Sequence, residues 1–241
     1  MSLNLTERAQ YIIKFQALCD QYLPAICDPK DKSVLVIGCG WGTEMLWSLM
    51  KGAREVTGID VKERDTEALD EALQYFNCYK PGNYKMVQMD VANIAELNQK
   101  FDLVLSLNVF EHLPDIDLAL KLCRNILSNE GRIAIFADPL YYSSCGSHIP
   151  EDKILPWEHI WNINNEIVAK RNMSGLNKAT LSDFINAIHA NDLIILHFSI
   201  VPDRNLAKPE YLLKAIMSGS KSVTDLTTEG VCMELAYVKK N

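Results

Sequence analysis

The sequence predicts an α/β fold: a doubly wound, mostly parallel sheet of seven strands in a single domain of 241 residues. Three observations predict it. Short apolar segments of strand length alternate with segments of helical periodicity along most of the chain. The strand-like segments are almost continuously apolar, which is typical of parallel strands covered on both faces. A glycine-rich turn also joins the first of them directly to a helix, as at the ligand-binding edge of such sheets.

Composition and charge exclude several classes of protein. Hydrophobic residues make up 48% and charged residues 23% of the chain, as in an ordinary globular domain. The 31 acidic residues outnumber the 24 basic ones, and the net charge of −7 disfavours a general binder of nucleic acids or anionic membranes, which needs a positive field. We therefore expect a small-molecule partner, no nucleic acid and no membrane.

The cysteines and the first residues predict the compartment. The 7 cysteines are an odd number, are scattered and form no C-x-x-C pair, and the N-terminus lacks the basic and apolar regions of a signal peptide. The longest apolar segments, such as Leu103–Leu107, are far shorter than a membrane span. We expect free thiols in a cytoplasmic protein.

The chain begins with a helical extension over residues 1–32. Thr6 is the expected N-cap of a helix over residues 3–23, which Pro24 ends. A core of alternating strands and helices follows over residues 33–138. Its expected strands are Ser33–Gly38, Glu55–Asp60, Tyr84–Met89, Phe101–Leu107 and Arg132–Ala137. Its expected helices are Thr43–Lys51, Lys62–Phe76 and Ile116–Leu127.

The alternation is interrupted over residues 139–178. This segment holds three prolines and several turns without clear periodicity, so we expect an inserted loop region. Regular structure returns over residues 179–241, the C-terminal part of the sheet with a helical insertion. The elements expected there are the helices Ala179–Ala190 and Pro209–Met217 and the strands Asp192–Val201 and Val231–Val238.

The most informative segment is the turn after the first strand. The apolar run Val34–Ile37 leads into glycines at alternate positions, which are Gly38, Gly40 and Gly42, and a helix follows. Glycines allow a tight turn and let a ligand approach where a Cβ atom would clash. We therefore expect a nucleoside ligand at this turn.

Acidic residues follow at the ends of the next strands. Asp60 ends the second strand, 22 residues after Gly38, where a carboxylate can accept hydrogen bonds from ribose hydroxyls. Asp90 ends the third strand. The structural alternative is that each acid caps a helix or faces water. For Asp102, which begins a strand, we favour that alternative.

These landmarks, in this order, resemble class I S-adenosylmethionine-dependent methyltransferases, in particular the type 11-like small-molecule methyltransferases. A dinucleotide-binding turn, as in a nicotinamide oxidoreductase, would have its third glycine at position 43, where this chain has Thr43. The segment Phe101–Leu113, which ends in Glu-His-Leu, and the turn Leu127–Arg132 extend the resemblance over residues 33–138. It implies a Rossmann-like methyltransferase fold and S-adenosyl-L-methionine as the cofactor.

The resemblance also implies which residues bind the cofactor. Asp60 matches the ribose-binding acid of the family, and Asp90 matches its adenine-binding position. The full set is Gly38, Cys39, Gly40, Gly42, Asp60, Val61, Asp90, Val91 and Asn108. Most members of the family also have an acid two residues before the first glycine, which helps to hold the methionine end, and this chain has Val36 there. Two alternatives follow: the cofactor binds more weakly, or backbone carbonyls around Gly38 and the side chain of Asn108 hold the amino group instead.

Histidines are the candidate bases if the methyl acceptor is a hydroxyl group. His189 and His197 lie in a regular helix and strand, so we expect them to be structural. The other three lie on irregular segments after strands, where substrate sites form, and are His112, His148 and His159. We predict His159 or His148 as the base, with His112 near the methyl-transfer centre.

The insertion supplies candidate substrate contacts. The resemblance implies a substrate lid over residues 139–178, and its aromatic residues suit the lining of a pocket. We predict that Tyr141, Tyr142 and Trp157 bind the substrate. The alternative for Trp157 and Trp161, four residues apart, is that they anchor a short helix on the core.

The predicted function is methyl transfer from S-adenosyl-L-methionine to a small-molecule acceptor, at oxygen. Two alternatives remain open: a non-catalytic, methyltransferase-like protein that binds a nucleoside, and a methyltransferase that acts on RNA or protein. We expect no metal site, because the spacing of His148, Glu158 and His159 matches no metal-binding motif and adjacent residues diverge on a helix.

Overall fold

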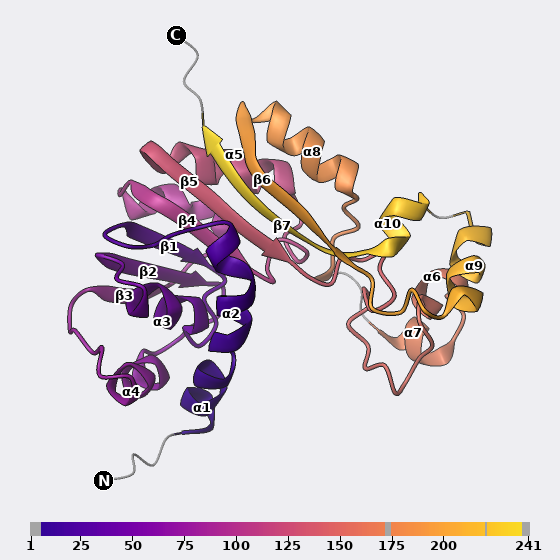
Figure 1. Ribbon diagram of the computed structural model, residues 1–241, viewed down its shortest axis with the longest axis horizontal. Helices are drawn as coiled ribbons and strands as arrows, with labels where there is room; N and C mark the ends of the chain where they lie inside the picture. Colours follow the sequence, from indigo (N-terminus) through magenta and orange to yellow (C-terminus); the bar gives the residue numbers. More distant parts are fainter. Residues whose placement is uncertain (1–5, 172–174, 220, 238–241) are drawn as a thin grey trace.

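The computed structural model describes residues 6–171, 175–219 and 221–237. Its centre is a sheet of seven strands in the order β3-β2-β1-β4-β5-β7-β6 (Figure 1). The strands are β1 (Ser33–Ile37), β2 (Glu55–Asp60), β3 (Tyr84–Gln88), β4 (Phe101–Leu107), β5 (Leu127–Ala137), β6 (Leu193–Pro202) and β7 (Thr228–Tyr237).

The direction of the strands confirms the predicted sheet. The neighbours among β1 to β5 pair in parallel, whereas β7 is antiparallel to both β5 and β6. The sheet is therefore doubly wound and mostly parallel. The strand order reverses between β1 and β4, and in open α/β sheets a ligand binds at the carboxyl ends of the strands beside such a reversal.

Helices cover both faces of the sheet. On one face lie α1 (Glu7–Lys14), α2 (Gln16–Tyr22), the 3₁₀ segment η1 (Leu23–Ala25), α3 (Thr43–Met50) and α4 (Glu67–Tyr75). On the other lie the 3₁₀ segment η2 (Val91–Leu97), α5 (Ile116–Asn125) and α8 (Leu181–Ala190). Val34 and Val36 pack into the first layer, and Leu35 and Ile37 into the second. Successive residues of β1 are thus buried on opposite faces, which explains its continuous apolar sequence.

The N-terminal helix is divided in two. The predicted helix over residues 3–23 has its first three residues outside the described part of the chain. The rest is interrupted at Phe15, which lies between the end of α1 and the start of α2. Thr6 caps α1 as predicted, because its side chain accepts a hydrogen bond from the backbone N–H of Ala9 at 3.3 Å. Pro24 lies in η1, directly after α2.

Two predicted boundaries differ from the structure by five residues, for local reasons. Residues 62–66, predicted as the start of a helix, form a turn before α4, because Asp60 and Asp65 each accept the backbone N–H group two residues on. β5 begins at Leu127 rather than Arg132, because the strand continues through an irregularity in its pairing with β4.

Residues 140–170, 203–219 and 221–227 build an appended lobe at the end of the long strands β6 and β7 (Figure 1). Its helices are α6 (Glu158–Trp161), α7 (Glu166–Lys170), α9 (Pro209–Met217) and α10 (Val223–Thr227). Trp157, Ala215 and Leu226 form its fully buried centre. Asp203 also accepts a hydrogen bond from the backbone N–H of Ser144 at 2.6 Å. The loop insertion and the helical insertion predicted separately therefore pack as one unit.

Asp102 has a structural position, as predicted. Its carboxylate accepts hydrogen bonds from the backbone N–H of Ser33 at 3.0 Å and from Ser128 Oγ at 2.8 Å, and Arg54 pairs with it at 3.0 Å. These contacts lower the pKa of Asp102 against the opposing effect of its burial. Asp102 therefore joins the amino-terminal ends of β1, β4 and β5, away from the crevice.

Within the described residues, every helix is too short or too polar to cross a membrane. All seven cysteine side chains are free thiols. The same residues contain no group of three or more His, Cys, Asp or Glu side chains placed to share a metal ion.

Candidate functional site

The glycine turn after β1 has left-handed backbone at each of its three glycines. A Cβ atom at Gly38 would lie 2.3 Å from Val109 Cγ2, and one at Gly42 would lie 2.9 Å from Met86 Cε, so these glycines permit close packing. A Cβ atom at Gly40 would meet nothing within 4 Å. Gly40, with φ +51°, therefore borders open space where a ligand can approach the backbone.

Asp60 ties this turn to the end of β2. Its Oδ2 accepts a hydrogen bond from the backbone N–H of Gly40 at 3.0 Å, and its Oδ1 accepts one from Lys62 at 2.9 Å. Arg64 Nε lies 3.8 Å from Oδ1. Each carboxylate oxygen can accept more than one hydrogen bond, so Asp60 can brace the turn and still bind a hydroxyl group.

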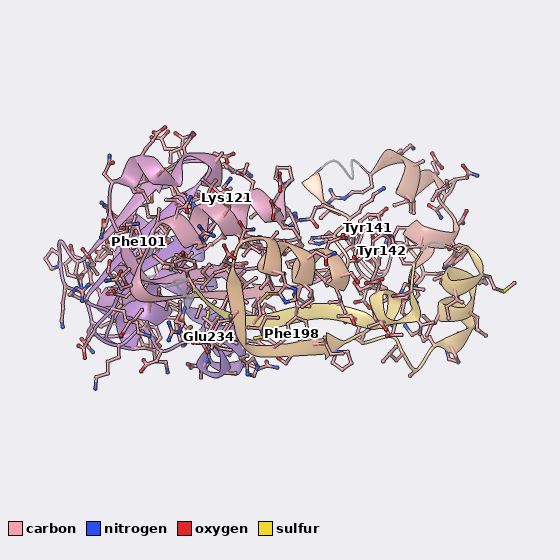
Figure 2. All side chains as sticks on the ribbon, turned by 90° about the horizontal axis from the view of Figure 1, so that it is seen from above. Phe101, Lys121, Tyr141, Tyr142, Phe198 and Glu234 are labelled. Atoms are coloured by element: carbon pink, nitrogen blue, oxygen red, sulfur yellow. The ribbon has the colours of Figure 1, made fainter. Side chains whose placement is uncertain are left out.

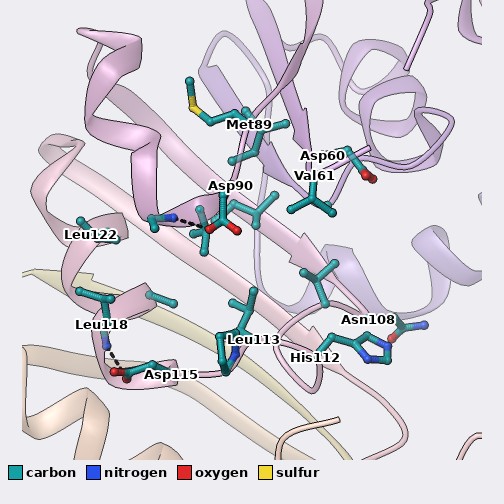
Figure 3. Close-up of a pocket in the computed structure, with 18 residues that line it drawn as sticks. Asp60, Val61, Met89, Asp90, Asn108, His112, Leu113, Asp115, Leu118 and Leu122 are labelled. Carbon is teal, nitrogen blue, oxygen red and sulfur yellow. Dashed lines mark hydrogen bonds between the residues drawn. The ribbon is translucent and has the colours of Figure 1, made fainter. Parts of the chain in front are cut away.

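A first cavity of about 440 Å³ opens at the carboxyl ends of β1, β2 and β4. Its size is within the range of small-molecule sites. It brings together seven of the residues predicted from the sequence, which are Gly38, Asp60, Val61, Asp90, Val91, Asn108 and His112. Figure 3 shows Asp60, Val61 and Asp90 on one side of this cavity and Asn108 and His112 on the opposite side.

Asp90 caps a helix and also lies at the first cavity. Its side chain accepts a hydrogen bond from the backbone N–H of Ala92 at 2.8 Å and so caps η2 (Figure 3). It also lines the first cavity. The cap therefore holds the Asp90 side chain in place at the cavity.

A second cavity of about 460 Å³ lies on the other side of the glycine turn. The turn contributes Cys39 and Gly40, and α1 and α2 contribute Tyr11 and Leu18. Gly38 and Asn108 line both cavities. The two cavities therefore meet at these two residues, with the glycine turn between them.

Two arginines stack on the turn, an arrangement that the sequence analysis missed. The guanidinium groups of Arg8 from α1 and Arg64 lie 4.0 and 4.3 Å from the ring centroid of Trp41. Arg8 also pairs with Asp65 at 3.6 Å. These contacts hold α1 against the turn, and no sequence signal links Arg8 to a tryptophan so distant in the chain.

The structure also gathers the predicted histidines. The ring centroids of His112 and His148 are 5.0 Å apart. His112 Nδ1 lies 2.8 Å from the carbonyl oxygen of Gly175, which only accepts, so Nδ1 carries a hydrogen. Nε2 of the neutral ring then keeps its lone pair and lies 3.9 Å from Glu111 Oε1. Burial and the neighbouring His112 lower the pKa of His148.

His159 differs from the other two. Its side chain is 1% exposed, and its Nε2 donates to the carbonyl oxygen of Tyr141 at 2.8 Å. Burial lowers the pKa of His159 to about 4, so the ring is neutral. It lines neither of the two cavities. The sequence could not reveal this burial, because α6 has only four residues and shows no periodicity.

The predicted substrate residues are divided between the junction and the lobe. Figure 2 shows Tyr141 and Tyr142 together where the sheet meets the appended lobe, and their ring centroids are 5.1 Å apart. Tyr141 contacts His159, whereas Tyr142 packs against the lobe. Trp157 is fully buried and donates its indole N–H to the carbonyl oxygen of Leu226 at 2.9 Å. Its placement is that of a core anchor and not of a pocket lining, which corrects the prediction for Trp157.

Glu111 is a buried acid that the sequence analysis assigned only to a motif. It is 2% exposed, and neither of its carboxylate oxygens has a hydrogen-bond partner among the described residues. Burial, with a smaller contribution from Asp138, raises the pKa of Glu111 to about 8. Glu111 is therefore a neutral carboxylic acid below that pH, next to His112.

Comparison with known proteins identifies the central part of the chain. Residues 34–131 match the family model described as a methyltransferase domain. The ubiquinone biosynthesis O-methyltransferase of Neisseria meningitidis is 30% identical over 114 residues, which are 46% of this chain and 46% of the relative. The tRNA U34 carboxymethyltransferase of Cellvibrio japonicus is 26% identical over 143 residues, 59% of this chain and 44% of the relative. The chain spans about half the length of the curated relatives that it matches.

A solved structure shares the fold over almost the whole chain. It is the geranyl diphosphate C-methyltransferase from Streptomyces coelicolor in complex with Mg²⁺, geranyl diphosphate and S-adenosyl-L-homocysteine. The alignment covers 98% of this chain and 86% of that one, with a TM-score of 0.60 and 11% identity. The chain thus has the class I methyltransferase fold. The match of residues 34–131 to the methyltransferase model falls within the first five strands of this sheet.

Proposed function

We propose that this protein is an S-adenosyl-L-methionine-dependent methyltransferase that methylates a small-molecule acceptor at oxygen. The observation that carries the proposal is the pair of cavities that meet at Gly38 and Asn108, inside the matched methyltransferase domain. The name of the Neisseria relative, an O-methyltransferase, supports oxygen as the acceptor atom.

The residues around the glycine turn fit this cofactor. The first cavity would hold its nucleoside, with Asp60 accepting from the ribose hydroxyls and Asp90 from the exocyclic amine of adenine. Val61 and Val91 would contact the apolar faces of the base. The methionine half would pass the open space beside Gly40 into the second cavity.

Methyl transfer chiefly requires that the acceptor atom be aligned with the methyl group. When bound, S-adenosyl-L-methionine supplies a methyl group on a sulfonium that is already activated for displacement. The protein then has to hold the acceptor oxygen in line and take up its proton. We assign this proton to Nε2 of His112, because His112 lines the first cavity and Gly175 fixes its tautomer. His148 supports the His112 ring, and the buried His159 holds Tyr141 in place.

Isothermal titration with S-adenosyl-L-homocysteine tests cofactor binding. We expect binding with a dissociation constant in the micromolar range, and no binding at millimolar concentration would contradict the proposal. Methyl transfer is then measured against a panel of small hydroxyl-bearing compounds and against bulk tRNA. Transfer to tRNA alone would favour the RNA alternative, which the Cellvibrio relative motivates and the net charge of −7 opposes. Binding without transfer to any acceptor would favour the non-catalytic alternative.

The base assignment predicts the behaviour of the His112→Asn variant. Its turnover with a hydroxyl acceptor should fall about 100-fold, the lower end of the range for general-base catalysis, since the donor is already activated. Its affinity for S-adenosyl-L-homocysteine should stay within about twofold of the wild type. His189→Asn, on α8, is the matched control. Equal losses of turnover and cofactor affinity would make His112 a binding residue and not the base.

A further inference from the structure

Glu44 is a buried acid in the wall of the second cavity. It is the second residue of α3, directly after the glycine turn. Its side chain is 7% exposed, and it lines the cavity together with Gly38, Gly40 and Asn108. The first turn of a helix favours a negative charge, so the backbone of α3 stabilises an ionised carboxylate at this position.

No cation in the described part of the chain neutralises Glu44. The hydrogen bond to its carboxylate comes from its own backbone N–H, and burial raises the pKa of Glu44 to about 7. Its ionisable neighbours are the thiols of Cys19 and Cys39. The nearby arginines Arg8 and Arg64 both stack on Trp41. A desolvated carboxylate on a cavity wall without a counter-ion is suited to a ligand that brings a positive charge.

We propose that Glu44 binds the α-ammonium group of the amino-acid half of the cofactor. This inference rests on the proposed function, because it takes the nucleoside to occupy the first cavity. A ligand that extends from there past Gly38 and Asn108 enters the cavity that Glu44 lines. Its ammonium group is the complementary charge, and a hydrogen bond between two ions is stronger than one to a neutral amide or carbonyl.

The surroundings of Glu44 agree with this role. Val36, at the position where the resembled family has an acid, is fully buried in the apolar cluster that also contains Cys39 and Met45. β1 therefore offers no charge to the ligand on this face. Asn108 is neutral and shared by both cavities, so it can orient the ligand without balancing its charge. Glu44 supplies the negative charge that balances the ligand, and it does so from α3 and not from β1.

The test compares three ligands by isothermal titration. They are S-adenosyl-L-homocysteine, its analogue that lacks the amino group, and 5′-methylthioadenosine, which lacks the amino-acid half. We expect the wild type to prefer S-adenosyl-L-homocysteine over the desamino analogue by about 30-fold, and Glu44→Gln to abolish this preference. The affinity for 5′-methylthioadenosine should be the same in both proteins. Glu96→Gln, an exposed acid on η2, is the matched control.

Each outcome decides between the two proposals. If the wild type binds none of the three ligands, both the proposed function and the role of Glu44 are overturned. If it binds S-adenosyl-L-homocysteine but Glu44→Gln keeps the preference over the desamino analogue, only the role of Glu44 is overturned. Should Glu44→Gln fail to fold, Glu44→Asp replaces it. Its shorter side chain keeps the charge, and we expect a preference reduced to about fivefold. An unchanged preference in Glu44→Asp, or none in the wild type, also overturns the role of Glu44.

Discussion

Replacing Glu111 by glutamine is expected to flatten the dependence of the free energy of unfolding on pH. Glu111 is 2% exposed and its carboxylate oxygens have no hydrogen-bond partner among the described residues, so the folded protein favours the neutral acid. Burial raises its pKa from 4.5 to about 8. The unfolded chain loses this proton at a much lower pH than the folded protein.

The sign of the effect follows from this difference. The stability that neutral Glu111 contributes is fully present below about pH 4.5 and is lost as the pH rises through about 8. The loss over this window is of the order of 5 kcal/mol, since each pKa unit corresponds to about 1.4 kcal/mol. Glutamine has a similar shape and no proton to lose. We therefore expect Glu111→Gln to be more stable than the wild type at alkaline pH and to lose this advantage at acidic pH.

Urea denaturation at a series of pH values from about 5 to 9 measures this effect. Glu44 and Asp138, whose pKa values burial also raises, contribute slopes of the same sign in both proteins, so the comparison isolates Glu111. The surface variant Glu96→Gln serves as the control for the loss of one carboxylate. Parallel curves for Glu111→Gln and the wild type would show that Glu111 is ionised or solvated in the folded protein.

Asp60→Ala is expected to weaken the binding of S-adenosyl-L-homocysteine several-hundred-fold. The proposed site gives this carboxylate two hydrogen bonds from the ribose hydroxyls, and hydrogen bonds to a charged acceptor contribute about 1.5–3 kcal/mol each. The carboxylate also holds the backbone N–H of Gly40 at 3.0 Å, so its removal loosens the turn that borders the ligand. At the lower end of that range, the two bonds and the loosened turn together correspond to about 3–4 kcal/mol of binding free energy.

Calorimetry on Asp60→Ala and Asp60→Asn separates the two contributions. Asparagine can still accept the hydrogen bond from Gly40 but has no charge. We therefore expect the loss of ligand affinity in Asp60→Asn to be intermediate. Asp152→Ala, a surface acid paired with Lys153 in the appended lobe, is the control. If Asp60→Ala binds as tightly as the wild type, Asp60 only braces the turn and the ribose is held elsewhere.

The sheet could be predicted from the sequence because its signal is local. Segments such as Val34–Ile37 and Leu103–Leu107 are buried on both faces, and their apolar composition is visible without knowledge of their partners. The division of the N-terminal helix at Phe15 and the packing of Trp157 against Leu226 are not visible in this way. The packing of Trp157 depends on a contact between segments 69 residues apart, and the periodicity of the sequence does not indicate such contacts.

The candidate site also has features that the sequence predicts and features that only the structure reveals. Asp60 and Asp90 follow strands of one parallel sheet, so their meeting at one edge could be predicted, and they line one cavity. The three candidate histidines could be listed from the sequence, but their order, with His159 or His148 ahead of His112, could not take account of the burial that separates His159 from His112. Glu44 and Glu111 are ordinary acids in the sequence, and only their burial in the structure distinguishes them from surface acids.

The packing of two separate segments into the appended lobe decides how the lobe can be exchanged between related proteins. A graft of residues 140–170 alone would carry Trp157 but leave Ala215 and Leu226 behind. The smallest unit that can be exchanged with its interior intact is therefore the pair of segments 140–170 and 203–227, moved together while α8 and β6 between them stay in place. Chimeras between related proteins should therefore exchange both segments together, and a single-segment exchange should lose stability.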